Sequence, residues 1–167
     1  MRRIKTRQLT ALGLMLAMIV ALSIIEHTMP PIPGLPPGVR LGLSNVVTMY
    51  ALFFMGRIQA ILLAVLKSVF VLLTRGGIAG LLSFGGGIIS ILGILALILI
   101  FGDRISYLAL SVFGAILHNI GQISISAVIL GSGLVFLYIP PLIISGVIMG
   151  TVTGTLLRVI MPLWRIR

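Results

Sequence analysis

The segment that decides the fold is IQAILLAVLKSVFVLLT, residues 58–74, in which Lys67 is the only charged side chain. Its length and apolar character predict one membrane-spanning helix. A cation near the middle of a bilayer costs several kcal/mol unless it faces a cavity, a partner or a ligand. The chain has only two acidic residues, Glu26 and Asp103, and both fall at the ends of other predicted helices. The segment therefore raises the question of which group supplies a negative charge to Lys67.

The composition excludes a soluble protein. Hydrophobic residues make up 59% of the 167 residues, charged residues make up 8%, and the mean hydropathy is +1.30. A soluble domain of this length cannot bury so much apolar surface. The length suits a single domain over residues 1–167 with six transmembrane helices of roughly 20 residues each. We therefore expect an all-α, polytopic membrane bundle.

Six apolar segments and the breaks between them define the expected helices. Residues 28–40 contain five of the eight prolines and cannot be helical, because proline fixes φ and lacks an amide donor. Arg75-Gly-Gly77 ends the third helix, and a glycine-rich stretch that includes Gly80 and Gly85-Gly86-Gly87 follows and overlaps the early turns of the fourth. The N-terminal apolar run is interpreted as a retained first helix and not as a signal peptide. The expected helices are residues 8–25, 41–55, 58–74, 81–101, 105–130 and 140–160.

The cations indicate a membrane topology. The formal net charge is +10, but the cations lie at segment ends and form no stripe, so no nucleic-acid partner is expected. Six helices put both termini on one side, and placing the termini in the cytoplasm puts nine cations inside and two outside. This excess predicts a multi-pass protein of the cell membrane with cytoplasmic termini. The inner cations are Arg2, Arg3, Lys5, Arg7, Arg57, Arg104, Arg158, Arg165 and Arg167, and the outer ones are Arg40 and Arg75.

Polar residues on the predicted helices are candidates for a binding site around Lys67. Such groups are costly in lipid and must face the interior. In one interpretation they line a pocket open to the outside, roofed by the proline-rich and glycine-rich loops, and its positive charge favours an anionic or carbonyl-rich small molecule. In the other, Lys67 bonds to backbone carbonyls or to Glu26, and the polar groups join helices to one another. The candidate binding residues are Lys67, Asn45, Arg40, Arg75, His118, Asn119, Gln122 and Thr48.

Small residues four positions apart form one face on the first predicted helix and one face on the last. Small side chains let helix backbones approach closely in lipid. The face on the last helix is expected to pack within the bundle. The face on the first is expected either to pack in the same way or to dock another membrane protein. The two sets are Gly13, Ala17 and Ala21, and Gly146, Gly150 and Gly154.

Several activities lack the residues that they need. The chain has no glycine-rich phosphate loop ending in Gly-Lys-Ser or Gly-Lys-Thr, so it does not hydrolyse ATP by itself. It has no cysteine, two histidines and two separated acids, which predict neither a metal site nor a catalytic pair of carboxylates. We expect no enzymatic activity and no cofactor.

Three segments resemble one family of membrane proteins. The runs PPGVRLGLSN (residues 36–45) and YALFFMG (residues 50–56), with the Lys67 helix, resemble the Gx transporter family, also named heptaprenyl diphosphate synthase component I. That family is similar to the S components of energy-coupling factor (ECF) transporters, six-helix membrane proteins that bind the substrate. The resemblance implies that the loops after the first and third helices cover a small-molecule ligand. It also implies that Gly13, Ala17 and Ala21 dock a transmembrane coupling subunit, and that two cytoplasmic ATPases supply the energy. S components usually carry alanine at such positions, so Gly13 departs from the pattern.

Two functions are open at this point. The first is ligand capture for an ECF-type transporter. The second is that of a non-catalytic membrane partner in a quinone or isoprenoid system, or in flavin-linked extracellular electron transfer. The synthase name does not imply catalysis by this chain. Prenyl diphosphate synthases hold diphosphate through magnesium on aspartate-rich clusters, and this chain has only Glu26 and Asp103.

Overall fold

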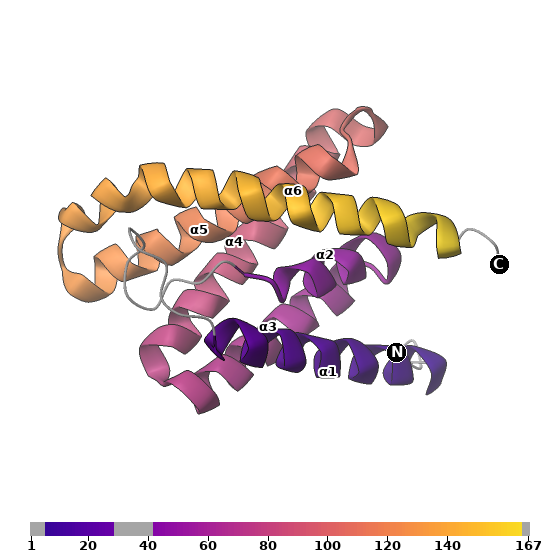
Figure 1. Ribbon diagram of the computed structural model, residues 1–167, viewed down its shortest axis with the longest axis horizontal. Helices are drawn as coiled ribbons and strands as arrows, with labels where there is room; N and C mark the ends of the chain where they lie inside the picture. The colour runs from indigo at the N-terminus through magenta and orange to yellow at the C-terminus, as the bar shows by residue number, and fades with distance from the viewer. Residues whose placement is uncertain (1–5, 29–41, 165–167) are drawn as a thin grey trace.

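Every regular element that the structure describes is helical, which confirms the all-α prediction. The structure is a computed structural model, and it describes residues 6–28 and 42–164. Figure 1 shows the six α-helices as a single bundle. The helices are α1 (Thr6–Thr28), α2 (Asn45–Phe54), α3 (Arg57–Arg75), α4 (Gly77–Phe101), α5 (Tyr107–Leu130) and α6 (Ile139–Trp164), with short 3₁₀ turns η1 (Gly102–Arg104) and η2 (Gly133–Tyr138).

Five of the helices have the length and apolar character of membrane spans. These are α1, α3, α4, α5 and α6. The exception is α2, which was predicted over residues 41–55 but has only 10 helical residues. At 1.5 Å per residue it is about 15 Å long, roughly half of the hydrocarbon core of a bilayer. The number of helices agrees with the prediction, but the second one is too short to cross the membrane.

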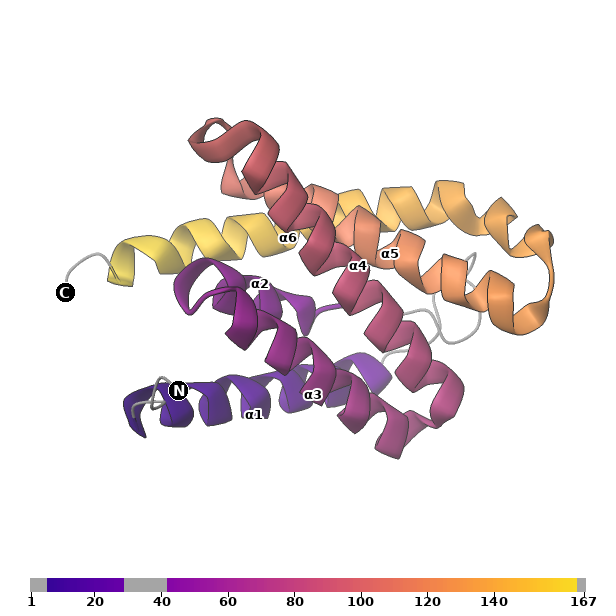
Figure 2. The same cartoon turned by 180° about the vertical axis from the view of Figure 1, so that it is seen from behind.

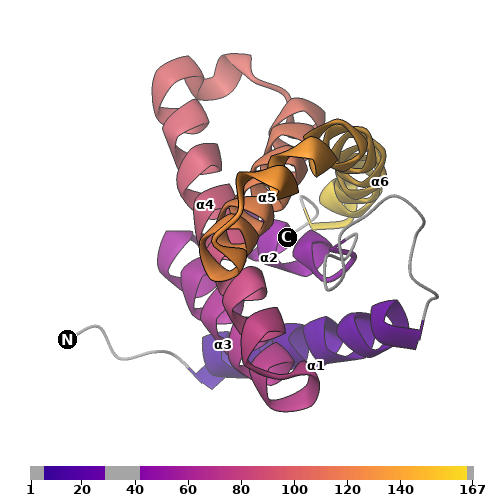
Figure 3. The same ribbon diagram turned by 90° about the vertical axis from the view of Figure 1, so that its left-hand side faces the viewer.

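The short helix α2 lies between the first and last helices of the chain. Figure 1 shows α1 and α6 on either side of α2, and the end view in Figure 3 shows the same order. Seen from behind, α3 and α4 run side by side and obliquely to α1 and α6 (Figure 2). The start of α1 and the end of α6 lie at the same end of the bundle (Figure 1). Which side of the cell this end faces stays a prediction.

The glycine-rich segment after α3 forms helix, so the predicted loop there is wrong. Only Gly76, with φ +89°, separates α3 from α4, and α4 contains all the glycines that follow. Gly80, Gly85 and Gly86 are sites of close helix packing. A Cβ built on Gly80 would lie 2.6 Å from Leu72 Cβ, one built on Gly85 would lie 2.6 Å from Ile125 Cγ1, and one built on Gly86 would lie 2.8 Å from the His118 ring. Glycine lets helices approach closely at these positions, and the segment cannot roof a pocket as a loop.

The glycine face of α6 packs inside the bundle, as expected. It lies against α5, which packs between α4 and α6. A Cβ built on Gly150 would lie 2.8 Å from the Ser111 carbonyl oxygen and from the Val112 nitrogen. These are backbone atoms, and they cannot move away as a flexible side chain would. The close contact between α5 and α6 therefore depends on glycine, which has no side chain, at position 150.

We predict that Gly150→Ala destabilises the protein by about 1–3 kcal/mol, because an added methyl group in a tight contact forces the two backbones apart. Gly13→Ala is the matched control, since no atom lies within 4 Å of a Cβ built there. The control also replaces a helical glycine by alanine, and it is expected to be neutral or slightly stabilising. Thermal unfolding in detergent, followed by circular dichroism, measures both variants. Equal melting temperatures for the two would contradict the packing assignment.

Candidate functional site

Lys67 is buried at the centre of the bundle and bonds to the start of α2. Its side chain is 7% exposed. The ammonium group donates a hydrogen bond to Asn45 Oδ1 over 2.5 Å. Asn45 is the first residue of α2, so the short helix begins where its amide reaches the lysine. The buried ammonium group therefore donates a hydrogen bond to a neutral amide oxygen.

Glu26, from the C-terminal part of α1, lies in the same region. Its carboxylate accepts a hydrogen bond from the backbone amide of Gly42, just before α2, and its side chain is 5% exposed. The charges of Glu26 and Arg75 both act on Lys67. The three side chains line one cavity, and their formal charges of +1, +1 and −1 sum to +1. The charge balance at the centre of the bundle is therefore positive even with the acid present.

The cavity beside Lys67 is small and polar. Its volume is about 20 Å³, about the room that one water molecule needs. Each buried polar group without a hydrogen bond costs about 1–3 kcal/mol, so the cavity favours an occupant with several hydrogen-bonding groups. Five of its lining atoms have no partner among the described residues: Ser23 Oγ, Ser44 Oγ, Ser83 Oγ, His118 Nδ1 and Gln122 Oε1.

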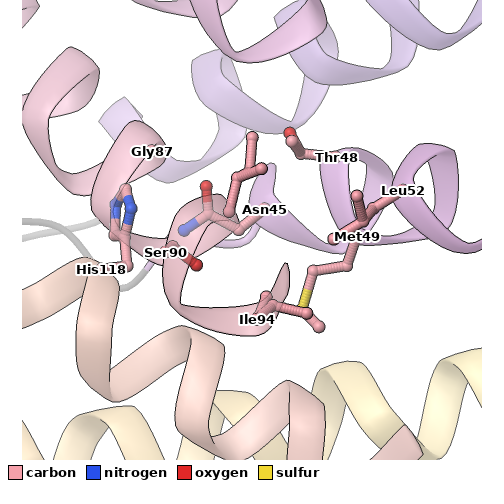
Figure 4. Close-up of a pocket in the computed structure, with 9 residues that line it drawn as sticks. Asn45, Thr48, Met49, Leu52, Gly87, Ser90, Ile94 and His118 are labelled. Carbon is pink, nitrogen blue, oxygen red and sulfur yellow. The ribbon is translucent and has the colours of Figure 1, made fainter. Parts of the chain in front are cut away.

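A second cavity also borders His118 (Figure 4). It measures about 10 Å³ and is lined by residues of α2, α4 and α5. Figure 4 shows His118, Asn45 and Ser90 at one side of this cavity and Met49, Leu52 and Ile94 at the other. Of the residues that line the two cavities, His118 alone lines both.

The two polar residues of α5 that line the first cavity are bonded to each other. The Gln122 amide donates to His118 Nε2 at 2.8 Å, one helical turn apart. Because Nε2 accepts this bond, a neutral His118 ring carries its proton on Nδ1. That nitrogen is then a hydrogen-bond donor, like the three serine hydroxyls around the cavity. The arrangement offers donors to an electron-rich group placed near Lys67.

Most of the predicted binding residues come together around the two cavities, but Asn119 lies apart. Its side-chain nitrogen donates to the Leu142 carbonyl oxygen at 2.8 Å and to Ser145 Oγ at 3.1 Å. Both acceptors belong to α6, so Asn119 joins two helices. Arg40 lies outside the described residues. The residues that line one cavity or the other are Lys67, Asn45, Arg75, His118, Gln122 and Thr48.

Four serines line the cavities, and the sequence interpretation did not count them as binding residues. Ser23 and Glu26 share a face of α1 at a spacing of three, and Ser83 and Ser90 share a face of α4 at a spacing of seven. These periodicities could have indicated them. Ser44 gives no such signal, because it precedes α2 and only the chain path places it beside Lys67.

The small-residue face of α1 is uncovered. Gly13, Ala17 and Ala21 are all exposed, and no atom of the described residues lies within 4 Å of a Cβ built on Gly13. Unlike the glycine face of α6, Gly13 makes no close helix contact with the residues that the structure describes.

The chain was compared with known families, with curated proteins and with solved structures. No curated protein and no solved structure matches it. A family model described as heptaprenyl diphosphate synthase component I matches residues 15–160, which include Lys67 and every residue that lines the two cavities. With five helices long and apolar enough to cross a membrane, the chain is a multi-pass membrane protein that belongs to the heptaprenyl diphosphate synthase component I family.

Proposed function

We propose that this protein is the substrate-binding subunit of an ECF-type transporter, similar to an S component. One observation carries the proposal. A buried lysine lies beside a polar cavity that collects hydrogen-bonding groups from α1, α3, α4 and α5 and from the turn before α2. Intramembrane ionisable residues that face a cavity commonly bind a substrate or an ion. The uncovered small-residue face of α1 supports a second role, contact with a partner in the membrane.

The charge of the site favours an anionic or carbonyl-rich ligand. Lys67 and Arg75 outweigh Glu26 in formal charge, and the serine hydroxyls and His118 Nδ1 add neutral donors. A carboxylate or a carbonyl oxygen accepts such bonds without a proton of its own. The cavity of about 20 Å³ admits only a small group, so a larger molecule enters only if the elements around it separate. The bond between Glu26 and Gly42 joins α1 to the start of α2, and it is one contact that such a separation would break.

The energy for transport comes from partners in this proposal. A transmembrane coupling subunit docks on Gly13, Ala17 and Ala21, where small side chains permit close helix packing. Two cytoplasmic ATPases drive the cycle, since the chain has no phosphate-binding loop. The protein itself is not an enzyme and resides in the cell membrane with both termini in the cytoplasm.

The family description favours a second candidate function. It names a component of a synthase, which suits a non-catalytic membrane partner in a quinone or isoprenoid system, or in flavin-linked electron transfer. In that case the small-residue face of α1 holds a different protein, and the cavity beside Lys67 has only a structural role. The two candidates differ in whether the purified chain retains a small molecule.

We predict that Lys67→Met strongly reduces ligand retention in the purified protein. A hydrogen bond to a charged group contributes about 1.5–3 kcal/mol, so affinity should fall by a factor of about ten or more. Mass spectrometry of small molecules released from wild-type and variant protein measures the effect. Asn119→Leu is the control, because Asn119 bonds to α6 and lines neither cavity. It should lower the melting temperature and leave ligand retention unchanged.

Two outcomes would contradict ligand capture. One is a wild-type protein that retains no small molecule. The other is a Lys67→Met variant that retains the wild-type ligand in full.

We also predict that Ala17→Leu prevents assembly with the coupling subunit and ATPases of an ECF transporter when all are expressed together. A bulky side chain on this exposed face keeps the partner helix at a distance. Ala96→Leu is the matched control, since Ala96 is exposed on α4, away from the α1 face. Affinity purification of the tagged chain measures the co-purified subunits. Recovery of the complete complex with Ala17→Leu would show that the partner docks elsewhere.

A further inference from the structure

We propose that a groove between α1, α2 and α6 holds one acyl chain of an anionic membrane phospholipid. The inference does not depend on ligand capture at Lys67, because the groove shares no lining residue with the cavity there. It rests on the shape and chemistry of two adjoining hollows. One has a volume of about 310 Å³ and the other of about 250 Å³. Both are lined by Ala11, Met15 and Tyr50, so together they form one continuous groove.

The short helix α2 lies along the whole length of the groove. Its 10 residues lie between helices of 23 and 26 residues (Figure 1). The groove is lined on α2 from Val46 to Phe54. On α1 it is lined by Leu14 and Met18, and on α6 by Leu157.

The length of the groove matches one leaflet of a bilayer. Along α1 its lining runs from Gln8 to Met18, which corresponds to about 15 Å of helix. The hydrocarbon core of a bilayer is about 30 Å thick, so one leaflet contributes about half of that. An acyl chain that starts at the membrane surface beside Gln8 would end near Met18.

The polarity of the groove changes along its length in the same direction as that of a lipid. The hollow around Leu14, Val46 and Leu157 has an entirely apolar lining surface, so it offers no hydrogen bond to a polar partner. The hollow nearer the chain ends includes the amide side chains of Gln8 and Gln59. A polar mouth and an apolar interior suit an amphiphilic molecule.

Charge complementarity selects an anionic headgroup. Arg57, the first residue of α3, is exposed two residues before Gln59 at the polar mouth. Four further cations occur among the seven residues that precede Gln8 in the sequence. Basic residues at the cytoplasmic surface attract anionic lipids. The predicted topology places this mouth in the cytoplasmic leaflet.

The test uses the full-length protein purified in detergent and native mass spectrometry. Phosphatidylglycerol and phosphatidylcholine with identical palmitoyl and oleoyl chains are added separately. Wild-type protein should carry one phosphatidylglycerol and little phosphatidylcholine. Ala11→Phe places a ring where the two hollows join and should abolish the bound phosphatidylglycerol. Ala96→Phe, an identical change on the exposed surface of α4, should keep it.

Two further variants keep the test decisive. Leu14→Trp fills the groove from a side chain that is 66% exposed, so it should remove the bound lipid even if Ala11→Phe does not fold. Arg57→Gln should reduce the preference for phosphatidylglycerol over phosphatidylcholine, whereas Arg104→Gln, at an exposed turn before α5, should not.

Equal binding of the two lipids by the wild type would overturn the proposal, as would lipid retention in a folded Ala11→Phe or Leu14→Trp variant. A dimer without lipid would show instead that a second copy of the chain covers the groove.

Discussion

A lysine among membrane-spanning helices must find its polar partners within the protein, since lipid offers none. This constraint accounts for the arrangement at the centre of the bundle. Asn45 accepts the hydrogen bond of Lys67, and the charges of Glu26 and Arg75 act on it. Glu26 in turn accepts a hydrogen bond from the backbone amide of Gly42. The φ of +82° at Gly42 favours glycine at this turn. One buried charge thus links α1, the turn before α2, α2 itself and α3.

The short helix α2 produces two different environments. Its first residue, Asn45, completes the polar centre around Lys67, and most of its other residues are apolar. Asn45 and Thr48 line a cavity within the bundle, whereas Val46, Val47 and Tyr50 line the groove. Two faces of one helix therefore border two hollows that differ in volume and in the kind of molecule that they suit.

Hydrophobic periodicity and segment breaks located the helices well but misjudged the glycines. Length and hydropathy located all five membrane-spanning helices, because a helix that satisfies its own backbone is required in lipid. The glycine-rich residues before the predicted start of the fourth helix were interpreted as a loop, yet they are helical, and Gly80 is a site where α4 touches α3. Asn119 shows a similar limit. Its polarity predicted an interior position, which is confirmed. Its polarity did not indicate whether the side chain would line a cavity or bond to α6, as it does.

The sequence by itself determined that the chain is an all-helical membrane protein with a buried cation and too few acids for carboxylate or magnesium chemistry. These conclusions depend on composition and periodicity alone, and both are local properties. Only the tertiary structure decided that Asn45 is the partner of Lys67, that serines from α1 and α4 surround the cavity, and that α2 is too short to span. The physical reason is that these features depend on how segments distant in the sequence pack, and packing in lipid is governed by small residues and hydrogen bonds between helices.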